Sequence, residues 1–225
     1  MSQAVAAAVP DSPDDLHDSS KALGVTDGKL AMWIFLGSDG MSFMGLIAAY
    51  FALRAKNFAQ WPDPTAHLAI GLTTVNTFIL IISSYFMVRA FLGAQQNNKS
   101  MLAWNLLFTI IGGAMFLGIQ VYEYTHQIGA GFTVSGFSPE YVEQWMAANE
   151  GAAIGGAASL FTATFYILTC FHGCHVLSGV IYLSVVLIGV LRGRWTTNRI
   201  EIVGLYWHFV DLVWIVIFTI IYLIK

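Results

Sequence analysis

Acidic and imidazole side chains lie inside long apolar stretches of this 225-residue sequence, where they could do chemistry. The stretch LYWHFVDLVWIVIF near the carboxyl end carries His208 and Asp211 one helical turn apart. Charged groups are costly in lipid, so residues of this kind are candidates for a functional site. The other candidates within apolar stretches are Asp39, Glu123, His172 and His175.

Metal binding is one chemistry that these residue types could support. Glu123 and His126 have the E-x-x-H spacing of di-iron carboxylate sites, which need a second such motif and two further glutamates. No second E-x-x-H occurs in the sequence. His172, His175 and His208 could ligate haem or copper, but axial haem ligation needs imidazoles from facing helices at matched depth, and His208 is shallower. Both patterns are incomplete and argue against a metal site, but a metal site stays open as an alternative.

A proton path is a second possibility. Asp39 lies nearly three turns into the first apolar run, and His208 and Asp211 lie at similar depth in the last. We therefore expect that these three residues could form one cluster near the same membrane surface. Histidine titrates near neutrality and burial can raise the pKa of a carboxyl group, so such a cluster could carry protons.

Hydrogen bonding across helix seams, or to the head groups of held lipids, is the interpretation that we favour. Polar side chains in lipid find partners, and each interhelical link contributes about 0.6 kcal/mol. Trp207, Asp211 and Trp214 have i, i+4, i+7 spacing and share a helix face, with His208 displaced by about 60° from Asp211. We expect this polar and aromatic face to dock against another helix or a lipid head group.

Composition identifies the class of protein that holds these residues. The chain is 57% hydrophobic and 10% charged with a mean hydropathy of +0.68, whereas soluble domains are about a quarter charged. The net charge is −3 and no basic stripe occurs, which argues against a nucleic-acid partner. The composition therefore predicts an integral membrane protein.

Five apolar runs are long enough to cross a bilayer, for which a helix needs about 20 residues. The runs cover about residues 30–53, 68–91, 101–124, 156–191 and 202–224. All five prolines fall outside them, as uninterrupted helices require. We predict an all-α bundle of five transmembrane helices over residues 30–225, preceded by a mobile cytoplasmic tail over residues 1–29.

Lysine and arginine counts in the short flanks predict the orientation, because cytoplasmic loops are enriched in them. The amino-terminal tail and the second and fourth loops share one side and hold Lys21, Lys29, Arg89, Lys99, Arg192, Arg194 and Arg199. The opposite side holds only Arg54, Lys56 and Lys225. We therefore expect the amino terminus in the cytoplasm and the carboxyl terminus outside.

Five ordered motifs resemble subunit III of the haem–copper terminal oxidases, over about residues 30–222. YWHFVDLVW resembles the last-helix signature of that family, and WIFLGSDGMSF resembles its first core helix. LTTVNTFILIISS, LGIQVYEY and FHGCHVLSG resemble the three helices between. The motif residues include Asn76, Thr77, Ser83, Ser84, Gln120, Glu123, Tyr124, His172, Gly173, His175, Val176 and Gly179.

The resemblance implies a non-catalytic core subunit of a proton-pumping respiratory oxidase. Such a subunit packs on subunit I, holds phospholipid between its helices, and supports proton uptake and enzyme lifetime. It carries no cofactor of its own, because haem and copper belong to partner subunits. Subunit II and a small subunit IV would complete the complex, in the inner (plasma) membrane of a bacterium. The electron donor, cytochrome c or a quinol, stays open.

Two features depart from the family pattern. Many members have seven helices, whereas this chain has the last five, so a neighbouring subunit could supply the missing pair. The family usually has glutamate where this chain has Asp39, which lies beside Ser38. Two alternatives stay open beside the oxidase subunit. A self-sufficient redox enzyme would use the histidines, and a transporter would use the intramembrane acids, although no pair of broken helices is evident.

Overall fold

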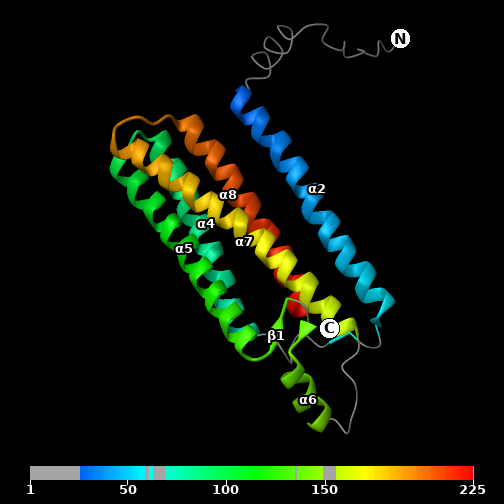
Figure 1. Ribbon diagram of the computed structural model, residues 1–225. Coiled ribbons are helices and arrows are strands. Elements are labelled where there is room, and N and C mark those ends of the chain that lie inside the picture. Colours follow the sequence, from blue (N-terminus) through cyan, green and yellow to red (C-terminus); the bar gives the residue numbers. More distant parts are fainter. Residues whose placement is uncertain (1–25, 59–60, 63–68, 135, 149–155, 225) are drawn as a thin grey trace, which may run out of the picture.

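The computed structural model describes residues 26–58, 61–62, 69–134, 136–148 and 156–224. Five long helices run roughly along one direction (Figure 1). They are α2 (Asp27–Lys56), α4 (Ile70–Gln95), α5 (Lys99–Gly129), α7 (Gly156–Leu191) and α8 (Thr197–Phe218). A π-helical turn, η2 (Thr219–Leu223), extends α8. Within the described part of the chain, five helices are long and apolar enough to cross a membrane. The prediction of a helical protein with five long apolar helices is confirmed.

The helix bounds differ from the predicted runs by a few residues. The largest differences are at Gly129, where α5 ends, and at Thr197, where α8 begins. Asn98 caps α5, because its side chain accepts a hydrogen bond from the backbone amide of Met101 at 3.1 Å. Most of the predicted tail lies outside the described residues, but α2 already includes positions 27–29.

The loop between α5 and α7 contains local structure that the sequence did not reveal. Strands β1 (Phe132–Thr133) and β2 (Gly136–Phe137) pair in an antiparallel hairpin, and α6 (Pro139–Ala148) follows. Tyr166 of α7 donates a hydrogen bond to the carbonyl oxygen of Phe132 at 2.7 Å. The hairpin is therefore fastened to the end of the helix bundle (Figure 1).

Helices α4, α5, α7 and α8 form the packed part of the molecule, and α2 lies along one side of it against α7 and α8 (Figure 1). The helices α4 and α5 form the most extensive pair. The largest fully buried side chains include Trp207, Trp214, Tyr50, Tyr222 and Phe116. The core is thus aromatic and lies between α8 and its neighbours.

Trp207 of α8 fills a space that two glycines leave open. A β-carbon at Gly113 of α5 would lie 2.5 Å from the Trp207 ring and 2.8 Å from Val180. A β-carbon at Gly179 of α7 would lie 3.0 Å from the same ring. Both helices therefore approach α8 closely only because these positions lack side chains.

We expect Gly113→Ala to destabilise the helix bundle by about 1–3 kcal/mol, the usual cost of overpacking a core. Gly118→Ala on the same helix is the matched control, because no atom lies within 4 Å of a β-carbon there. Thermal unfolding of the purified protein complex measures the difference. Equal midpoints for the two variants would show that Trp207 is not held tightly between the glycines.

Candidate functional site

The side chains of Asp39 on α2 and His175 on α7 form a polar contact that links these two helices. The Nε2 atom of His175 lies 3.1 Å from Oδ1 of Asp39. Nδ1 of His175 lies 2.7 Å from the carbonyl oxygen of Phe171, and the rings of Phe43 and Phe171 pack at 5.1 and 4.7 Å from the imidazole. The imidazole is therefore fixed on both nitrogens and on its faces.

The proton count of this pair follows from its partners. A carbonyl oxygen can only accept, so Nδ1 of His175 must carry a hydrogen. One further proton lies between Nε2 and Asp39, which makes the pair either imidazolium and carboxylate or neutral imidazole and carboxylic acid. Both forms carry no net charge, so the pair costs less to bury than a lone ion would.

A second polar contact joins α7 to α8 beside His175. The hydroxyl of Tyr206 donates to the carbonyl oxygen of His175 at 3.0 Å and lies 2.6 Å from Oγ of Ser178. The Tyr206 ring also lies 6.2 Å from Phe35 of α2. The three helices α2, α7 and α8 therefore meet around the backbone of His175.

Glu123 of α5 is the buried acceptor for three side chains. Its Oε1 atom accepts hydrogen bonds from Thr73 of α4 at 3.1 Å, from Gln127 at 3.1 Å and from Tyr222 of η2 at 3.3 Å. Only 2% of Glu123 is exposed. One carboxyl oxygen thus joins three separate elements, α4, α5 and η2.

Two tryptophans of α8 donate hydrogen bonds to α4. Nε1 of Trp207 donates to Oγ of Ser83 at 3.1 Å, and Nε1 of Trp214 donates to Oγ1 of Thr77 at 2.9 Å. Both indoles are fully buried. A buried indole N–H needs an acceptor, so these bonds fix the register of α8 against α4.

His172 is fully buried and lies one helical turn from His175, yet its surroundings are aromatic. Its ring stacks on Trp214 at 4.9 Å and meets the edge of Phe116 at 5.7 Å. Neither ring nitrogen has a hydrogen-bond partner among the described residues. His172 therefore fills the core beside α8 and does not share the polar contacts of His175.

The predicted cluster of Asp39, His208 and Asp211 is wrong for Asp39, whereas His208 and Asp211 do interact electrostatically with each other. Asp39 pairs with His175, while His208 is exposed on α8 and Asp211 is buried beside Ser84 of α4. Depth along a helix says nothing about direction around it, and the offset of about 60° carries His208 away from the seam that Asp211 faces. The shared face of Trp207, Asp211 and Trp214 does lie buried.

The residues considered for metal binding do not converge. Glu123 is buried, but His126, which is displaced by about 60° around α5, is exposed. His172, His175 and His208 have three different environments, in the core, beside Asp39 and at the surface. Over the described part of the chain, no three His, Cys, Asp or Glu side chains gather as a ligand set.

Several partners in these contacts were not singled out from the sequence. They are Thr73, Gln127, Tyr222, Tyr206, Ser178 and Arg54. Arg54 at the end of α2 is buried and donates to the carbonyl oxygen of Ile224 at 3.1 Å. In the sequence, Arg54 entered only the count of flanking charges that predicts the orientation. For most of them the partner lies far away in the sequence, so no local pattern marks them; Gln127, four residues from Glu123, is the exception.

Comparison with known proteins gives consistent matches. The family described as cytochrome c oxidase subunit III matches residues 141–225. Cytochrome c oxidase subunit 3 of Alkalihalophilus pseudofirmus is 32% identical over 219 residues, which cover 92% of this chain and 95% of that protein. The Bacillus subtilis protein of the same name is 33% identical over 200 residues, covering 86% and 84%. A probable quinol oxidase subunit 3 of Staphylococcus aureus is 29% identical over 200 residues, covering 87% and 88%.

We expect Glu123→Leu to destabilise the bundle, because three buried donors lose their acceptor and each such loss costs about 1–3 kcal/mol. Glu123→Gln should cost less, since an amide oxygen still accepts. His126→Gln, at an exposed position of the same helix, is the control. Thermal unfolding midpoints rank the variants. A Glu123→Leu protein as stable as the His126→Gln protein would contradict this role of the carboxyl group.

Proposed function

Because the chain belongs to the cytochrome c oxidase subunit III family, we propose that it is the non-catalytic core subunit of a proton-pumping respiratory oxidase. Haem and copper, which reduce oxygen to water, would lie in the partner subunits. The observation that supports the proposal is that buried ionisable groups bond to other parts of the protein. Asp39, His175 and Glu123 bond to protein groups from neighbouring helices, and among the described residues no three His, Cys, Asp or Glu side chains gather as a ligand set.

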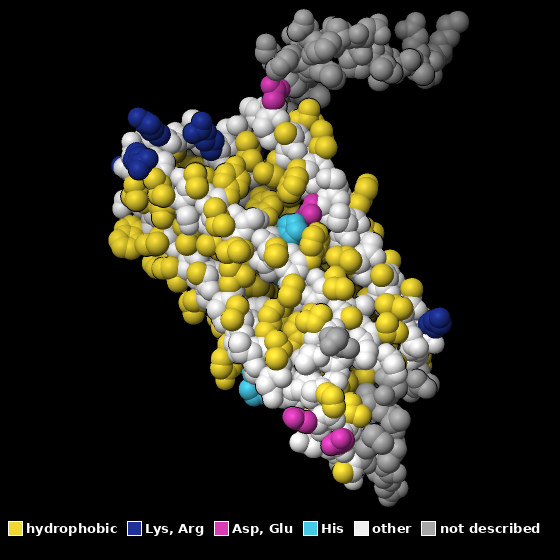
Figure 2. Space-filling model, viewed as in Figure 1, with side chains coloured by type: hydrophobic (Ala, Val, Ile, Leu, Met, Phe, Trp, Pro, Cys, Tyr) yellow, Lys and Arg dark blue, Asp and Glu magenta, His cyan; other side chains and the backbone are white. Residues whose placement is uncertain are grey.

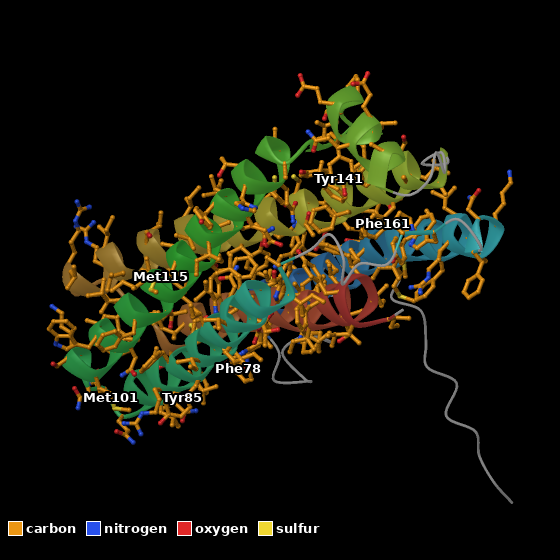
Figure 3. All side chains as sticks on the ribbon, turned by 90° about the horizontal axis from the view of Figure 1, so that it is seen from below. Phe78, Tyr85, Met101, Met115, Tyr141 and Phe161 are labelled. Atoms are coloured by element: carbon orange, nitrogen blue, oxygen red, sulfur yellow. The ribbon has the colours of Figure 1, made fainter. Side chains whose placement is uncertain are left out.

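The proposed direct partner is subunit I, with subunit II and a small subunit IV in the same complex. The outward surface of the bundle supports a membrane-embedded partner. On α4, the side chains of Val75, Phe78, Ile82 and Tyr85 follow one face and are more than half exposed. Figure 3 shows Phe78 and Tyr85 directed away from the other helices. Lipid or the helices of a partner must cover such a face.

We further propose that the chain holds phospholipid and supports proton uptake and enzyme lifetime. The candidates for this role are the polar groups Asp39, Glu123, His172, His175, His208 and Asp211, with Trp207. Among them, Asp39 and His175 have the geometry best suited to it. Their side chains keep 10% and 15% exposure between α2 and α7, so a head group or water can reach the edge of the pair.

The distribution of charge supports an orientation in the bacterial plasma membrane with the amino terminus in the cytoplasm. Most lysine and arginine side chains gather at one end of the bundle, although Asp27 and Glu201 also lie there, and the acidic side chains of α6 lie at the opposite end (Figure 2). The basic end holds Lys29, Arg89, Lys99, Arg192, Arg194 and Arg199. Cytoplasmic flanks are enriched in these residues, whereas Glu140 and Glu143 of α6 would face outward.

Affinity purification of the tagged chain from its native membrane tests the proposed assembly. We expect a haem–copper subunit I to co-purify in equal amount, with oxygen consumption in the purified complex. An Asp211→Leu variant should weaken this association or release bound lipid, and Leu212→Ala, at an exposed neighbouring position, is the control. Recovery of the chain without any haem–copper subunit would overturn the proposal.

We predict that Asp39→Asn shortens the working lifetime of the oxidase more than it slows the initial turnover. The substitution removes the proton-sharing partner of His175 without touching a redox centre. Oxygen-electrode traces give both the initial rate and the decay of activity during turnover. Glu140→Gln in α6 is the control, as this side chain is exposed. Complete loss of oxygen reduction from the first turnovers would contradict an accessory role for Asp39.

A further inference from the structure

A groove lies between the last turns of α7 and the start of α8, at the basic end of the bundle. Its volume is about 240 Å³. Its lining combines aliphatic and aromatic side chains with two arginines, and includes Tyr182, Val185, Gly189, Arg194, Trp195 and Arg199. The groove therefore presents an apolar surface and two guanidinium groups to the same ligand.

The two arginines of this groove have no acidic partner among the described residues. Arg194 and Arg199 are both exposed, and neither forms an ion pair with a described acid. Glu201 of α8 lies close in sequence, but Lys29 of α2 holds it at 2.6 Å. A guanidinium group has five N–H donors and binds carboxylates in a bidentate manner. The groove thus suits an anionic ligand that also carries an apolar side chain.

The segment PDSPDDLHD, residues 10–18, has this composition. It holds Asp11, Asp14, Asp15 and Asp18, together with the apolar side chain of Leu16. These residues lie outside the described part of the chain, so their placement is inferred from charge and from the point where the chain enters the bundle. The charge of the segment is opposite to that of the groove.

The chain enters the bundle beside the groove. Oγ1 of Thr26 donates a hydrogen bond to Oδ1 of Asn198 at 3.0 Å, and Arg199 is the next residue of α8. Twelve positions separate Asp14 from Thr26, and an extended chain covers about 3.3 Å per residue, so the acids have a reach of about 40 Å. A short tether keeps a segment at an effective concentration in about the millimolar range, at which weak ion pairs suffice for binding.

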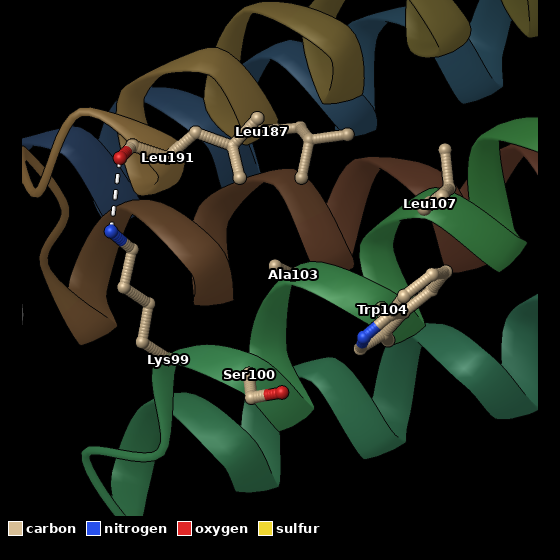
Figure 4. A pocket seen from close by; sticks show the side chains of 7 residues that line it. All are labelled: Lys99, Ser100, Ala103, Trp104, Leu107, Leu187 and Leu191. Atoms are coloured by element: carbon tan, nitrogen blue, oxygen red, sulfur yellow. Dashed lines mark hydrogen bonds between the residues drawn. The ribbon is translucent and has the colours of Figure 1, made fainter.

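A larger hollow at the same end of the bundle, between α5 and α7, has a different chemistry (Figure 4). Lys99 is the one cation in its lining, and its Nζ atom donates a hydrogen bond to the carbonyl oxygen of Leu191 at 2.9 Å. Ser100 and apolar or aromatic side chains make up the rest. This hollow suits an acidic segment less well than the groove with two arginines.

We propose that residues 14–16 dock in the groove between α7 and α8 of their own chain, with the two carboxylates on Arg194 and Arg199. Leu16 then packs against Trp195. The inference goes beyond the proposed function, and it requires neither a partner subunit nor a bound lipid.

The docked segment covers one end of the face of α7 that carries the Asp39–His175 pair. At 100° per residue, four positions of α7 fall within about 60° of one another, namely His175, Ser178, Tyr182 and Gly189. The last two line the groove, and the first two hold the polar contacts to α2 and α8. The groove is therefore a continuation of the seam around His175.

Disulfide cross-linking in membrane vesicles from cells that express the full chain tests the docking. His17→Cys leaves the acids and Leu16 in place, and Val185→Cys puts the second thiol in the groove. Cys170 and Cys174 are replaced by alanine in every variant. Mass spectrometry measures the cross-linked peptide after an oxidant is added. We expect this pair to cross-link at least about fivefold faster than His17→Cys with Ser100→Cys, whose second position lies in the hollow of Figure 4.

Charge substitutions in the same vesicles separate docking from chance collision. Arg194→Gln with Arg199→Gln should lower the cross-linking rate about fivefold, since two exposed ion pairs contribute modestly. High salt should lower it as well, because it screens exposed charges. Arg89→Gln with Lys99→Gln is the control, which removes an equal charge outside the groove and should leave the rate unchanged.

Equal cross-linking rates to Val185→Cys and Ser100→Cys would overturn the proposal, and that result is also expected if a lipid fills the groove. Equal rates for the two double charge variants would overturn it too. The first comparison keeps both arginines, so it decides the matter even if their substitution impairs folding. Failure to co-purify with a haem–copper subunit would refute the proposed function alone, because the vesicles are cross-linked before purification.

Discussion

Polar side chains inside a bilayer gain most from partners within the protein, and such bonds link the helices of this chain. Water is absent there, so each unpaired group costs far more than it would at a soluble surface. Glu123 gains such bonds by accepting from three elements, and Asp39 gains one by sharing a proton with His175. His172, whose ring nitrogens have no hydrogen-bond partner among the described residues, packs between aromatic rings instead. The polar groups that could have formed a catalytic site therefore hold helices together, with α2 joined to α7 and η2 joined to α4 and α5.

Close packing supplies the specificity that these modest bonds lack. Hydrophobic burial does not drive helices together in lipid, so association depends on close contact and interhelical hydrogen bonds. Trp207 uses both, because its ring lies between Gly113 and Gly179 while its N–H donates to Ser83. A one-residue shift of α8 would break the bond and drive the ring into neighbouring side chains. The aromatic core thus sets the register in which the polar pairs meet.

The sequence predicted the helices well because their signal is local. Apolar runs and proline positions located five spans, and the i, i+4, i+7 spacing identified the buried face of Trp207, Asp211 and Trp214. The site was predicted less well. Depth alone grouped Asp39 with His208, whereas its partner His175 lies 136 residues away on α7. Thr73 and Tyr222 had no local signal either, since their common acceptor Glu123 lies far from both in the chain. The β1–β2 hairpin was missed because its strands have two residues each.

We propose that the buried acids and imidazoles of this chain serve packing and proton sharing between helices, with no redox centre of their own. Metal analysis of the purified oxidase, before and after selective removal of this chain, tests it most directly. We predict that the amounts of iron and copper per subunit I are the same in both preparations. Loss of a stoichiometric amount of either metal together with the chain would contradict the account.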